Sequence, residues 1–381
     1  MKKDDINTLL VCSKSILSKI QNDTTINYLT YLSDTKLKEL FKLANRHGVL
    51  MHCYKYLNKT PQTSHILSLI KPLSTYTIQR QMLLSKQLLA IDKLFKQHNI
   101  PYIILKGPAI STLLYQDIIS RQFTDIDILI NKQHIKQAIK LLSTLNYQLD
   151  YDKTVLNNPK LYDVCSDIGL QDTNHHTSIE LHWQLIRQRF SDTLSSVDLF
   201  NDTQTIQIHN KSFTTLSNEI YLIYLCMHGS KHLWQSIKWI IDIDQLIQKH
   251  DINWQKVTTY TSQFQAKSSL ALGLSLAYEL YNTPIPSEFQ TTNKRINRLK
   301  HITKQQLYKP SSNTLYKKLL KFYYHANLKD TYTQQLLYYL KLPFGITPDD
   351  VLFINISKPY QVFYFLIRPL RLSLKLLGLY K

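Results

Sequence analysis

The chain has 381 residues, of which 44% are hydrophobic and 19% are charged, the composition of a globular protein with a substantial core rather than of a disordered chain. Its 46 Lys and Arg residues exceed its 27 Asp and Glu residues, and the formal net charge of +19 favours an anionic partner: nucleotide phosphates, nucleic acid or a membrane surface. Only seven glycines are present, which excludes glycine-rich phosphate loops of the Walker or Rossmann kind.

The sequence favours a reducing compartment and shows no membrane span. The four cysteines are scattered without a C-x-x-C pair, so neither a disulfide framework nor a thiolate zinc site is expected. Asp4 and Asp5 stand where a signal peptide would begin its apolar segment. No apolar run approaches the roughly 20 residues that a transmembrane helix needs. We therefore expect a cytoplasmic protein.

Residues 1–99 are expected to be helical, because apolar residues recur at helical spacing over residues 37–44 and again further on. A longer helix is predicted over residues 63–97, with a break or bend near Pro72 and an apolar stripe that begins at Met82. This region is expected to support the domain that follows it.

The stretch of residues 100–130 holds the first candidate for chemistry. An apolar, β-branched run over residues 103–105 predicts a strand that stops at Lys106 and Gly107, and a helical pattern follows. A glycine between a strand and a helix N-terminus lets a phosphate group approach the backbone closely, and the helix end favours its negative charge.

Residues 124–130 alternate between polar and apolar side chains and predict a second strand. Because residues two apart on a strand point to the same face, Asp125 and Asp127 project together, while Ile126 and Ile128 face the opposite side. Neighbouring carboxylates repel each other unless a cation lies between them, and Mg²⁺ prefers oxygen ligands. The alternative is a solvated strand edge with two exposed acids, which the apolar flanking residues disfavour.

Shorter elements follow the second strand. A helix is predicted over residues 132–145 with Asn131 as its cap, and a short strand over residues 147–151. A hairpin of residues 205–208 and 213–216 is expected to close the α/β region.

Between these elements, residues 177–183 alternate and predict another strand, on which Glu180 and His182 share one face. A third carboxylate of a metal site is expected on a strand whose opposite face is packed, and Glu180 has this position. On this pattern alone, solvent exposure explains Glu180 as well as metal binding does, and His182 fits a packed histidine better than a metal ligand.

Residues 216–381 are expected to be helical again. His228 and His232 lie four apart on one helical face, but the glutamate of a zincin is missing between them, so a zinc site is disfavoured. Lys231 and a histidine are instead expected to line a substrate cleft and to meet a phosphate or base there. The alternative is that the histidines are structural. The Asp-Ile-Asp at residues 242–244 lies on a helix, where two residues turn by roughly 200° and cannot form a metal pair.

The stretch of residues 362–375 is apolar with interspersed cations, and two interpretations remain open. A terminal helix docked on the core is the favoured one. The other is an amphipathic helix at a membrane interface, which would give peripheral membrane contact without a span.

The motifs described above resemble the uncharacterised nucleotidyltransferase family of bacteria, a branch of the polymerase-β-like superfamily. The residues that carry the resemblance are Leu105-Lys106-Gly107, Tyr115, Arg121, Asp125–Ile130, Ile179–Trp183, His228–Trp234 and Lys238–Asp242. One departure concerns Pro108, which stands where many superfamily members have Ser or Gly and offers neither a hydroxyl nor an N–H. A hydroxyl contact to phosphate must therefore come from elsewhere, such as Ser111 or Thr112, or be absent.

The resemblance implies an α+β fold, in which a polymerase-β-like nucleotidyltransferase core with a mixed sheet is flanked by helical regions. We expect an N-terminal helical region over residues 1–99, the catalytic core over residues 100–215 and a C-terminal helical domain over residues 216–381. The last of these would close the cleft and carry the acceptor specificity.

The resemblance also implies a site. Asp125, Asp127 and Glu180 would hold two Mg²⁺ ions, and Glu180 or Asp127 would help to take the acceptor's proton. Lys106, the Gly107 amide and Arg121 would neutralise the triphosphate as pyrophosphate leaves. The expected nucleotide-binding residues are, together, Lys106, Gly107, Ser111, Arg121, Lys231 and His232.

The expected function is that of a metal-dependent nucleotidyltransferase, which moves a nucleoside monophosphate from an NTP to an acceptor hydroxyl and releases pyrophosphate. A small molecule, sugar or peptide is favoured over RNA as acceptor, because the positive charge is spread along the chain without a run of four basic residues. Two alternatives are a catalytically silent protein that senses a nucleotide or RNA, and a toxin-like enzyme that modifies transfer RNA.

Overall fold

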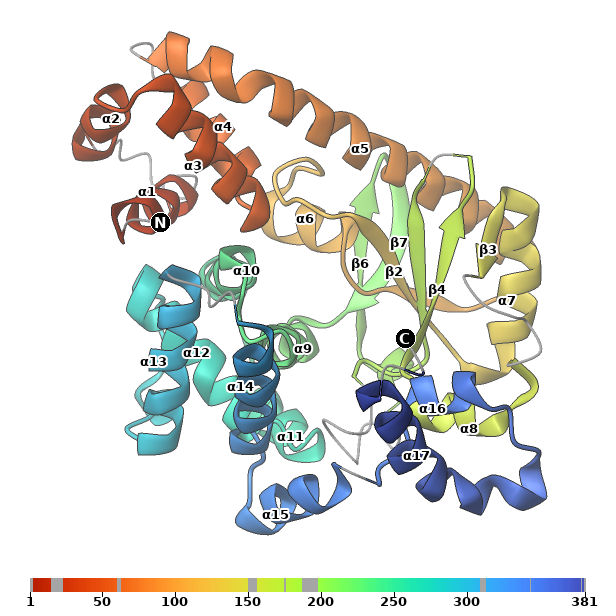
Figure 1. Cartoon of the computed structure of the whole chain (residues 1–381). Coiled ribbons are helices and arrows are strands. Elements are labelled where there is room, and N and C mark those ends of the chain that lie inside the picture. Colours follow the sequence, from red (N-terminus) through yellow and green to blue (C-terminus); the bar gives the residue numbers. More distant parts are fainter. Residues whose placement is uncertain are drawn as a thin grey trace.

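The computed structural model of the chain describes residues 3–14, 23–59, 63–149, 156–174, 176–186, 198–308, 313–342, 344–377 and 379. Within these residues, one mixed sheet of seven strands is accompanied by N-terminal and C-terminal helices (Figure 1). The strands are β1 (Tyr102–Ile104), β2 (Asp125–Ile130), β3 (Tyr147–Leu149), β4 (Asp167–Asp172), β5 (Ser178–His182), β6 (Thr203–Ile208) and β7 (Lys211–Leu216). The predicted α+β class, with a mixed sheet flanked by helical regions, is confirmed.

The strand order is β3-β4-β5-β2-β1-β7-β6, so the two strands that carry the predicted carboxylates are neighbours at the centre of the sheet. Strand β2 runs parallel to β5 and antiparallel to β1, which in turn runs parallel to β7. The predicted hairpin is confirmed as the antiparallel pair β6 and β7.

The two faces of the sheet pack against different cores. Ile126 and Ile128 belong to a sheet core, which also contains the buried residues of helix α5 from Leu84 onward. Leu129, the next residue along β2, instead belongs to a helical core formed by N-terminal and C-terminal helices. Because side chains alternate along a strand, Asp125 and Asp127 share the face of Leu129 and point toward the helical side.

The N-terminal region is helical, as predicted. Its longest helix is continuous through Pro72, so the predicted break is absent, and Met82 is exposed rather than part of the apolar stripe. The helices here are α1 (Lys3–Lys14), α2 (Asp23–Thr30), α3 (Asp34–Arg46), α4 (Leu50–Asn58) and α5 (Ser64–Gln97).

The α/β region contains three helices, α6 (Pro108–Tyr115), α7 (Ile135–Leu142) and α8 (Pro159–Val164). The helix predicted over residues 132–145 is α-helical only within α7, with a 3₁₀ turn at each end, and Asn131 makes no side-chain capping bond. The strand predicted over residues 147–151 is observed as β3, and its last two residues lie outside the described part of the chain.

The C-terminal region folds back onto the N-terminal helices, and α1 contacts α10, α12 and α13 (Figure 1). No helix in the described residues is long and apolar enough to cross a membrane. The helices are α9 (Asn218–Lys231), α10 (Ile237–Lys249), α11 (Trp254–Gln263), α12 (Lys267–Tyr281), α13 (Lys294–Tyr308), α14 (Thr314–Asn327), α15 (Tyr332–Lys341), α16 (Pro348–Phe353) and α17 (Tyr364–Leu376). The expected domain boundaries at residues 99/100 and 215/216 stay a prediction.

Candidate active site

The turn after β1 is held against the start of β2. The backbone N–H of Leu105 donates to the carbonyl of Asp127 over 3.0 Å, which places Lys106 and Gly107 beside the carboxylate strand. Gly107 has φ of 62°, and a Cβ atom there would lie 3.1 Å from the carbonyl oxygen of Asp125. Only glycine fits this conformation and this close approach without strain. Helix α6 then begins at Pro108, where a missing N–H costs no helical bond.

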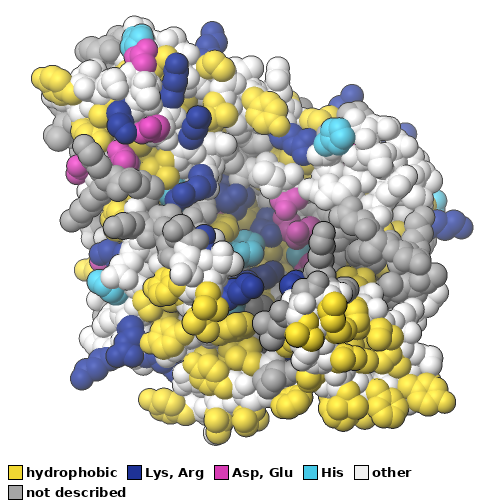
Figure 2. Space-filling view, in the orientation of Figure 1, with side chains coloured by type: hydrophobic (Ala, Val, Ile, Leu, Met, Phe, Trp, Pro, Cys, Tyr) yellow, Lys and Arg dark blue, Asp and Glu magenta, His cyan; other side chains and the backbone are white. Residues whose placement is uncertain are grey.

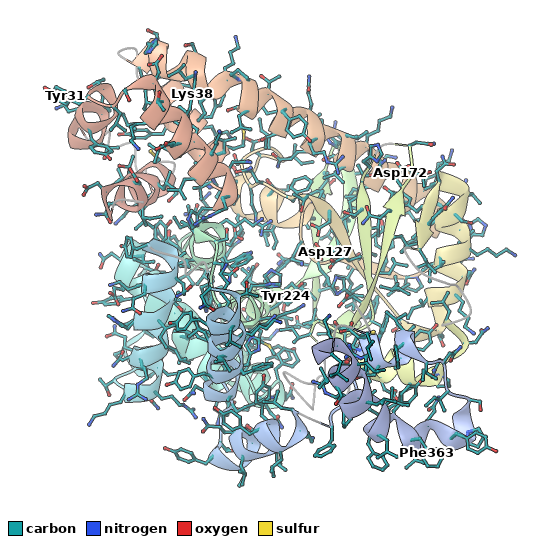
Figure 3. All side chains as sticks on the ribbon, viewed as in Figure 1. Tyr31, Lys38, Asp127, Asp172, Tyr224 and Phe363 are labelled. Atoms are coloured by element: carbon teal, nitrogen blue, oxygen red, sulfur yellow. The ribbon has the colours of Figure 1, made fainter. Side chains whose placement is uncertain are left out.

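The carboxylates on β2 and β5 meet through the parallel register of the two strands. Asp127 pairs with Glu180, and Asp125 pairs with Ser178. Asp127 is 1% exposed, whereas the Glu180 side chain is 40% exposed. Figure 2 shows a hollow at the centre of the molecule in which acidic, basic and histidine side chains gather, and Figure 3 places Asp127 in the same central region.

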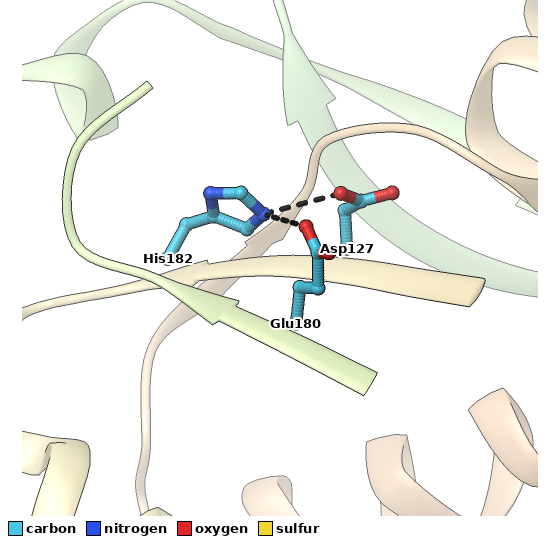
Figure 4. A group of neighbouring side chains, drawn as sticks. All are labelled: Asp127, Glu180 and His182. Atoms are coloured by element: carbon cyan, nitrogen blue, oxygen red, sulfur yellow. Dashed lines mark hydrogen bonds and ion pairs between the residues drawn. The ribbon is translucent and has the colours of Figure 1, made fainter. Parts of the chain in front are cut away.

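His182 joins the two carboxylates. Its Nε2 atom lies 3.1 Å from Oδ1 of Asp127 and 3.3 Å from Oε2 of Glu180 (Figure 4). One possible ligand atom from each of the three residues lies within 4.8 Å of the others. The Nζ atom of Lys106 lies 2.6 Å from Oδ1 of Asp127 on the side of the turn. Asp127 therefore sits between two cationic partners.

These contacts set the charge of each group. Burial alone would raise the pKa of Asp127, but Lys106 and then His182 hold it well below its ordinary value. Burial opposes protonation of His182, yet its hydrogen bonds to Asp127 and Glu180 raise the pKa of the imidazole to about 9. Burial also opposes the charge on Lys106, and Asp127 outweighs it, so the pKa of Lys106 is raised. Asp127 is ionised and both neighbours are protonated at neutral pH.

Asp125 has a different environment. Burial and then the charge of Asp127 raise the pKa of Asp125 to about 6, and Lys106 only partly offsets them. The predicted metal ligands are Asp125, Asp127 and Glu180. The three residues whose possible ligand atoms lie close together in the structure are instead Asp127, Glu180 and His182. The difference arises because Asp125 lies opposite Ser178, two strand positions before the Asp127–Glu180 pair.

The donors of this site fit a divalent cation. Asp127 and Glu180 supply hard carboxylate oxygens from two adjacent strands, which suits Mg²⁺. Asp125 projects on the same strand face. Its pKa is raised by burial and then by the charge of Asp127, and a bound cation would relieve the repulsion between the two carboxylates. The imidazole of His182 would also suit a softer ion such as Mn²⁺ or Zn²⁺ after losing its proton.

Helix α9 supplies the opposite wall. Tyr224 on α9 is buried and forms a hydrogen bond with Lys106, and Figure 3 shows it on the helical side across from Asp127. The rings of His228 and His232 lie 4.8 Å apart, and each lies 5.4 Å from the ring of Trp239 on α10. Neither histidine belongs to the group of possible metal-binding side chains that the described residues form.

Lys238 is a further cation that pattern reasoning missed. Its Nζ atom donates to the carbonyl of Gln122 over 3.2 Å, and its aliphatic stem crosses the position where a Cβ of Gly48 would lie. Burial and then Arg121 lower the pKa of Lys238 to about 8, while Asp125 works in the opposite direction. The only sequence signal was its place in the stretch 238–242, where no spacing distinguished it from a surface lysine.

Two predicted nucleotide contacts are instead engaged in protein contacts. Arg121 is 3% exposed, and its Nε donates to Oδ2 of Asp242 over 2.8 Å. The hydroxyl of Ser111 is buried, donates to the carbonyl of Asp117 and accepts from the N–H of Arg121. Both side chains fasten the loop between α6 and β2. The expectation that they contact phosphate stays a prediction.

The remaining predicted residues flank the site. Lys231, at the end of α9, is half-buried, and His232 directly after it is exposed. Asp244 accepts a hydrogen bond from Thr283 while Asp242 pairs with Arg121, so the two acids of α10 point to different partners, as predicted.

A model of a known protein family matches most of this chain. Residues 33–282 match the sequence model described as "Uncharacterised nucleotidyltransferase". A search of curated proteins found no match.

Two solved structures are similar at low identity. The lincosamide antibiotic adenylyltransferase LnuA, bound to lincomycin, is 19% identical, with 42% of this chain and 94% of that chain covered and a TM-score of 0.31. An antigenic nucleotidyltransferase-like protein from Paracoccidioides brasiliensis is 16% identical, with 56% of this chain and 96% of that chain covered and a TM-score of 0.35. The sequence match spans most of the chain, from α3 through the carboxylate strands to the end of α12, and the chain belongs to the uncharacterised nucleotidyltransferase family.

Proposed function

We propose that the chain is a divalent-metal-dependent enzyme that transfers a nucleoside monophosphate from an NTP to a hydroxyl group of a small acceptor and releases pyrophosphate. The observation that supports this most strongly is the parallel pairing of Asp127 with Glu180, with Asp125 on the same strand face and Lys106 in the adjoining turn. Acids on neighbouring strands beside a cationic turn suit the binding of a metal–triphosphate complex.

In this proposal Asp125, Asp127 and Glu180 hold two Mg²⁺ ions, which supply charge stabilisation for the triphosphate and activate the acceptor hydroxyl. The Glu180 side chain is 40% exposed, against 1% for Asp127, and accepts the acceptor's proton. Lys106 and Lys238 donate hydrogen bonds to phosphate oxygens from opposite sides, and the Gly107 amide lies at the start of α6.

The aromatic and imidazole rings of α9 and α10 suit a nucleobase. His232 is exposed, and its ring lies at 34° to that of Trp239 with the centroids 5.4 Å apart. A planar base gains stacking energy on such a surface without specific hydrogen bonds. Lys231 and His232 therefore keep their predicted role beside the nucleotide.

A small acceptor fits the site better than RNA. The cations around the carboxylates, Lys106 and Lys238, are partly or largely buried in the hollow, where they can meet one triphosphate. A nucleic-acid strand normally needs a continuous basic surface, and the sequence has no basic run. The cytoplasm, where NTP is available, is the proposed compartment.

The test is to incubate the full chain with Mg²⁺ and each α-labelled NTP, together with separated small-molecule, protein and RNA fractions. Label should enter the small-molecule or protein fraction and disappear with Asp127→Asn. Asp163→Asn, an exposed acid on α8 with 54% of its side chain accessible, serves as the matched control and should keep full activity.

Label in RNA alone would refute the small-acceptor proposal and favour an enzyme that modifies transfer RNA. Binding of NTP without label in any fraction would refute catalysis and favour a silent nucleotide sensor.

A further inference from the structure

The C-terminal helices carry an apolar surface that no described part of the chain covers. Figure 2 shows apolar side chains spread over the lower face of the molecule, in the region that α14, α15 and α17 occupy in Figure 1. Exposed fractions reach 66% at Leu315, 60% at Leu336 and 53% at Leu366. We call this surface the apolar face; its members are Leu315, Tyr316, Leu319, Phe322, Tyr332, Leu336, Leu337, Leu340, Phe344, Tyr360, Val362, Phe363, Phe365, Leu366 and Leu370.

Helix α14 is apolar on two sides. Leu320 and Tyr324 are buried in the helical core, whereas Leu315, Leu319 and Phe322 project outward at helical spacing. The inner side chains dock the helix on the helical core, whereas the outer stripe is exposed. Contiguous exposed apolar side chains on this scale mark a binding surface.

Helix α17 has its polarity reversed relative to a helix that faces water. Arg368 and Arg371 are 8% and 5% exposed, and their guanidinium groups point inward to Asp350, with 2.7 Å between Nε of Arg371 and Oδ1 of Asp350. Phe365, Leu366 and Leu370 of the same helix are exposed. A surface helix in water normally shows the opposite arrangement. The outer side of α17 therefore matches an apolar environment.

The charges around the apolar face are mostly positive. Residues 314–381 contain ten Lys and Arg residues but only three acids, Asp330, Asp349 and Asp350. Asp330 accepts hydrogen bonds from the backbone at the start of α12, and Asp350 is buried against the arginines of α17.

The exposed cations of this region lie on the same helices as the apolar face. They include Lys317 and Lys318 on α14, Lys341 on α15 and Lys375 on α17. A second copy of the chain would bring the same positive charges against each other, whereas a surface of anionic lipid headgroups complements them.

We propose that this face docks onto the surface of an anionic lipid bilayer, with the Leu and Phe side chains in the headgroup boundary and the lysines at the phosphate level. The proposal goes beyond the nucleotidyltransferase function. Tyr side chains at the same face, such as Tyr332 at 85% exposure and Tyr360 at 59%, have the amphipathic form that membrane interfaces favour. Docking is peripheral, in keeping with the absence of a spanning helix in the described residues.

The experiment is co-flotation of the full chain with vesicles of phosphatidylcholine alone and of phosphatidylcholine with phosphatidylglycerol. Binding should require the anionic lipid and weaken as salt is raised, because the lysine contribution is screened. The triple variant Leu336→Ser, Leu366→Ser, Leu370→Ser should bind at least about tenfold more weakly, since it removes buried apolar area. Lys317→Gln, Lys318→Gln, Lys375→Gln should lose most of the preference for anionic vesicles.

Matched controls lie on the far side of the molecule. Tyr31, directly after α2, and Tyr76, on α5, are 89% and 65% exposed, and Tyr31→Ser with Tyr76→Ser should leave vesicle binding unchanged. Lys38→Gln with Lys93→Gln is the corresponding charge control. Thermal unfolding of every variant checks that the fold is kept.

Two results would overturn the proposal. One is equal binding of the apolar-face variant and the control variant to anionic vesicles. The other is no vesicle binding together with a dimer in sedimentation that the Ser substitutions convert to a monomer, which would identify a second copy as the occupant.

Discussion

The ammonium group of Lys106 lies 2.6 Å from a carboxylate oxygen of Asp127, and both side chains are largely withdrawn from water. Lys106 lies two residues after the end of β1, and Asp127 lies on the antiparallel neighbour β2. His182 approaches the same oxygen of Asp127 from β5. The turn after β1 and strands β2 and β5 therefore place one negative charge between two positive ones. As a result, ionisation is favoured at Asp127 and disfavoured at Asp125, although the two residues belong to one motif.

Asp127→Asn should destabilise the metal-free protein by about 2–4 kcal/mol, because it leaves Lys106 and His182 buried without their counter-charge. Asp125→Asn should instead stabilise the metal-free protein at pH 8 by about 1–2 kcal/mol, after allowance for solvent screening. The reason is that it removes a carboxylate whose ionisation is disfavoured by burial and by the charge of Asp127. Denaturant unfolding of both variants measures the difference.

The pH dependence of the Asp125 effect follows from its pKa, which is raised to about 6 in the folded chain from 3.8. The unfolded chain loses the Asp125 proton at lower pH than the folded chain does. The free-energy cost of Asp125 to folding therefore grows between about pH 4 and pH 6 and is constant above pH 6. The gain from Asp125→Asn should therefore vanish at pH 4. Equal destabilisation by both substitutions at pH 8 would contradict this account of the site.

Triphosphate binding should depend on Lys106 and Lys238. Lys106→Met and Lys238→Met should each weaken binding of a non-hydrolysable NTP with Mg²⁺ by about 1.5–3 kcal/mol, the usual contribution of a charged hydrogen bond. Lys249→Met is the control, because Lys249 is an exposed lysine on α10 whose Nζ contacts the carbonyl of Leu114. Isothermal titration gives the affinities. Unchanged affinity in both site variants would place the phosphate site elsewhere.

The faces of the strands could be predicted from the sequence, because alternation along residues 124–130 and 177–183 is a local property. The parallel register that sets Asp127 opposite Glu180 could not be predicted by alternation, since it joins residues 53 positions apart through the packing of the whole sheet. Alternation placed Glu180 and His182 on one face and the family resemblance favoured Glu180 as a metal ligand, whereas the structure added the contact of His182 with Asp127.

Contacts between residues far apart along the chain could not be predicted from local sequence patterns either. The family resemblance implied that Arg121 binds the triphosphate. In the structure, its Nε forms an ion pair with Asp242 on α10, 121 residues away along the chain. The tail had two interpretations, and α17 combines features of both: Tyr364 docks in the sheet core while Leu366 faces outward.

The turn at Gly107 should be intolerant of any side chain. Gly107→Ala places a Cβ atom 3.1 Å from the carbonyl of Asp125 at φ of 62°, which costs about 1–3 kcal/mol and displaces the start of β2. We expect loss of both stability and nucleotide transfer. Gly169→Ala on β4 is the matched control, because no atom lies within 4 Å of the added Cβ. Thermal unfolding and the labelling assay compare them; equal effects of the two substitutions would rule out a special role for the turn.

His52 on α4 should make the protein sensitive to acid. Its side chain is buried against Tyr115, with ring centroids 5.2 Å apart, and neither ring nitrogen has a hydrogen-bond partner among the described residues. Burial and then Lys55 lower the pKa of His52 to about 3, whereas the unfolded chain takes up a proton near 6.5. Because the unfolded state binds more protons in this range, stability is complete above pH 6.5 and falls as the pH decreases toward 3.

His52→Phe removes this proton uptake while keeping an aromatic ring edge-on to Tyr115. The variant should differ little from the parent chain at pH 7.5 and be more stable by about 2 kcal/mol at pH 5, the cost of excluding a proton over 1.5 pH units. His301→Phe, an exposed position on α13, should not change the pH dependence. Urea unfolding from pH 5 to 8 tests this, and parallel curves for the parent and His52→Phe would show that His52 is protonated inside the fold.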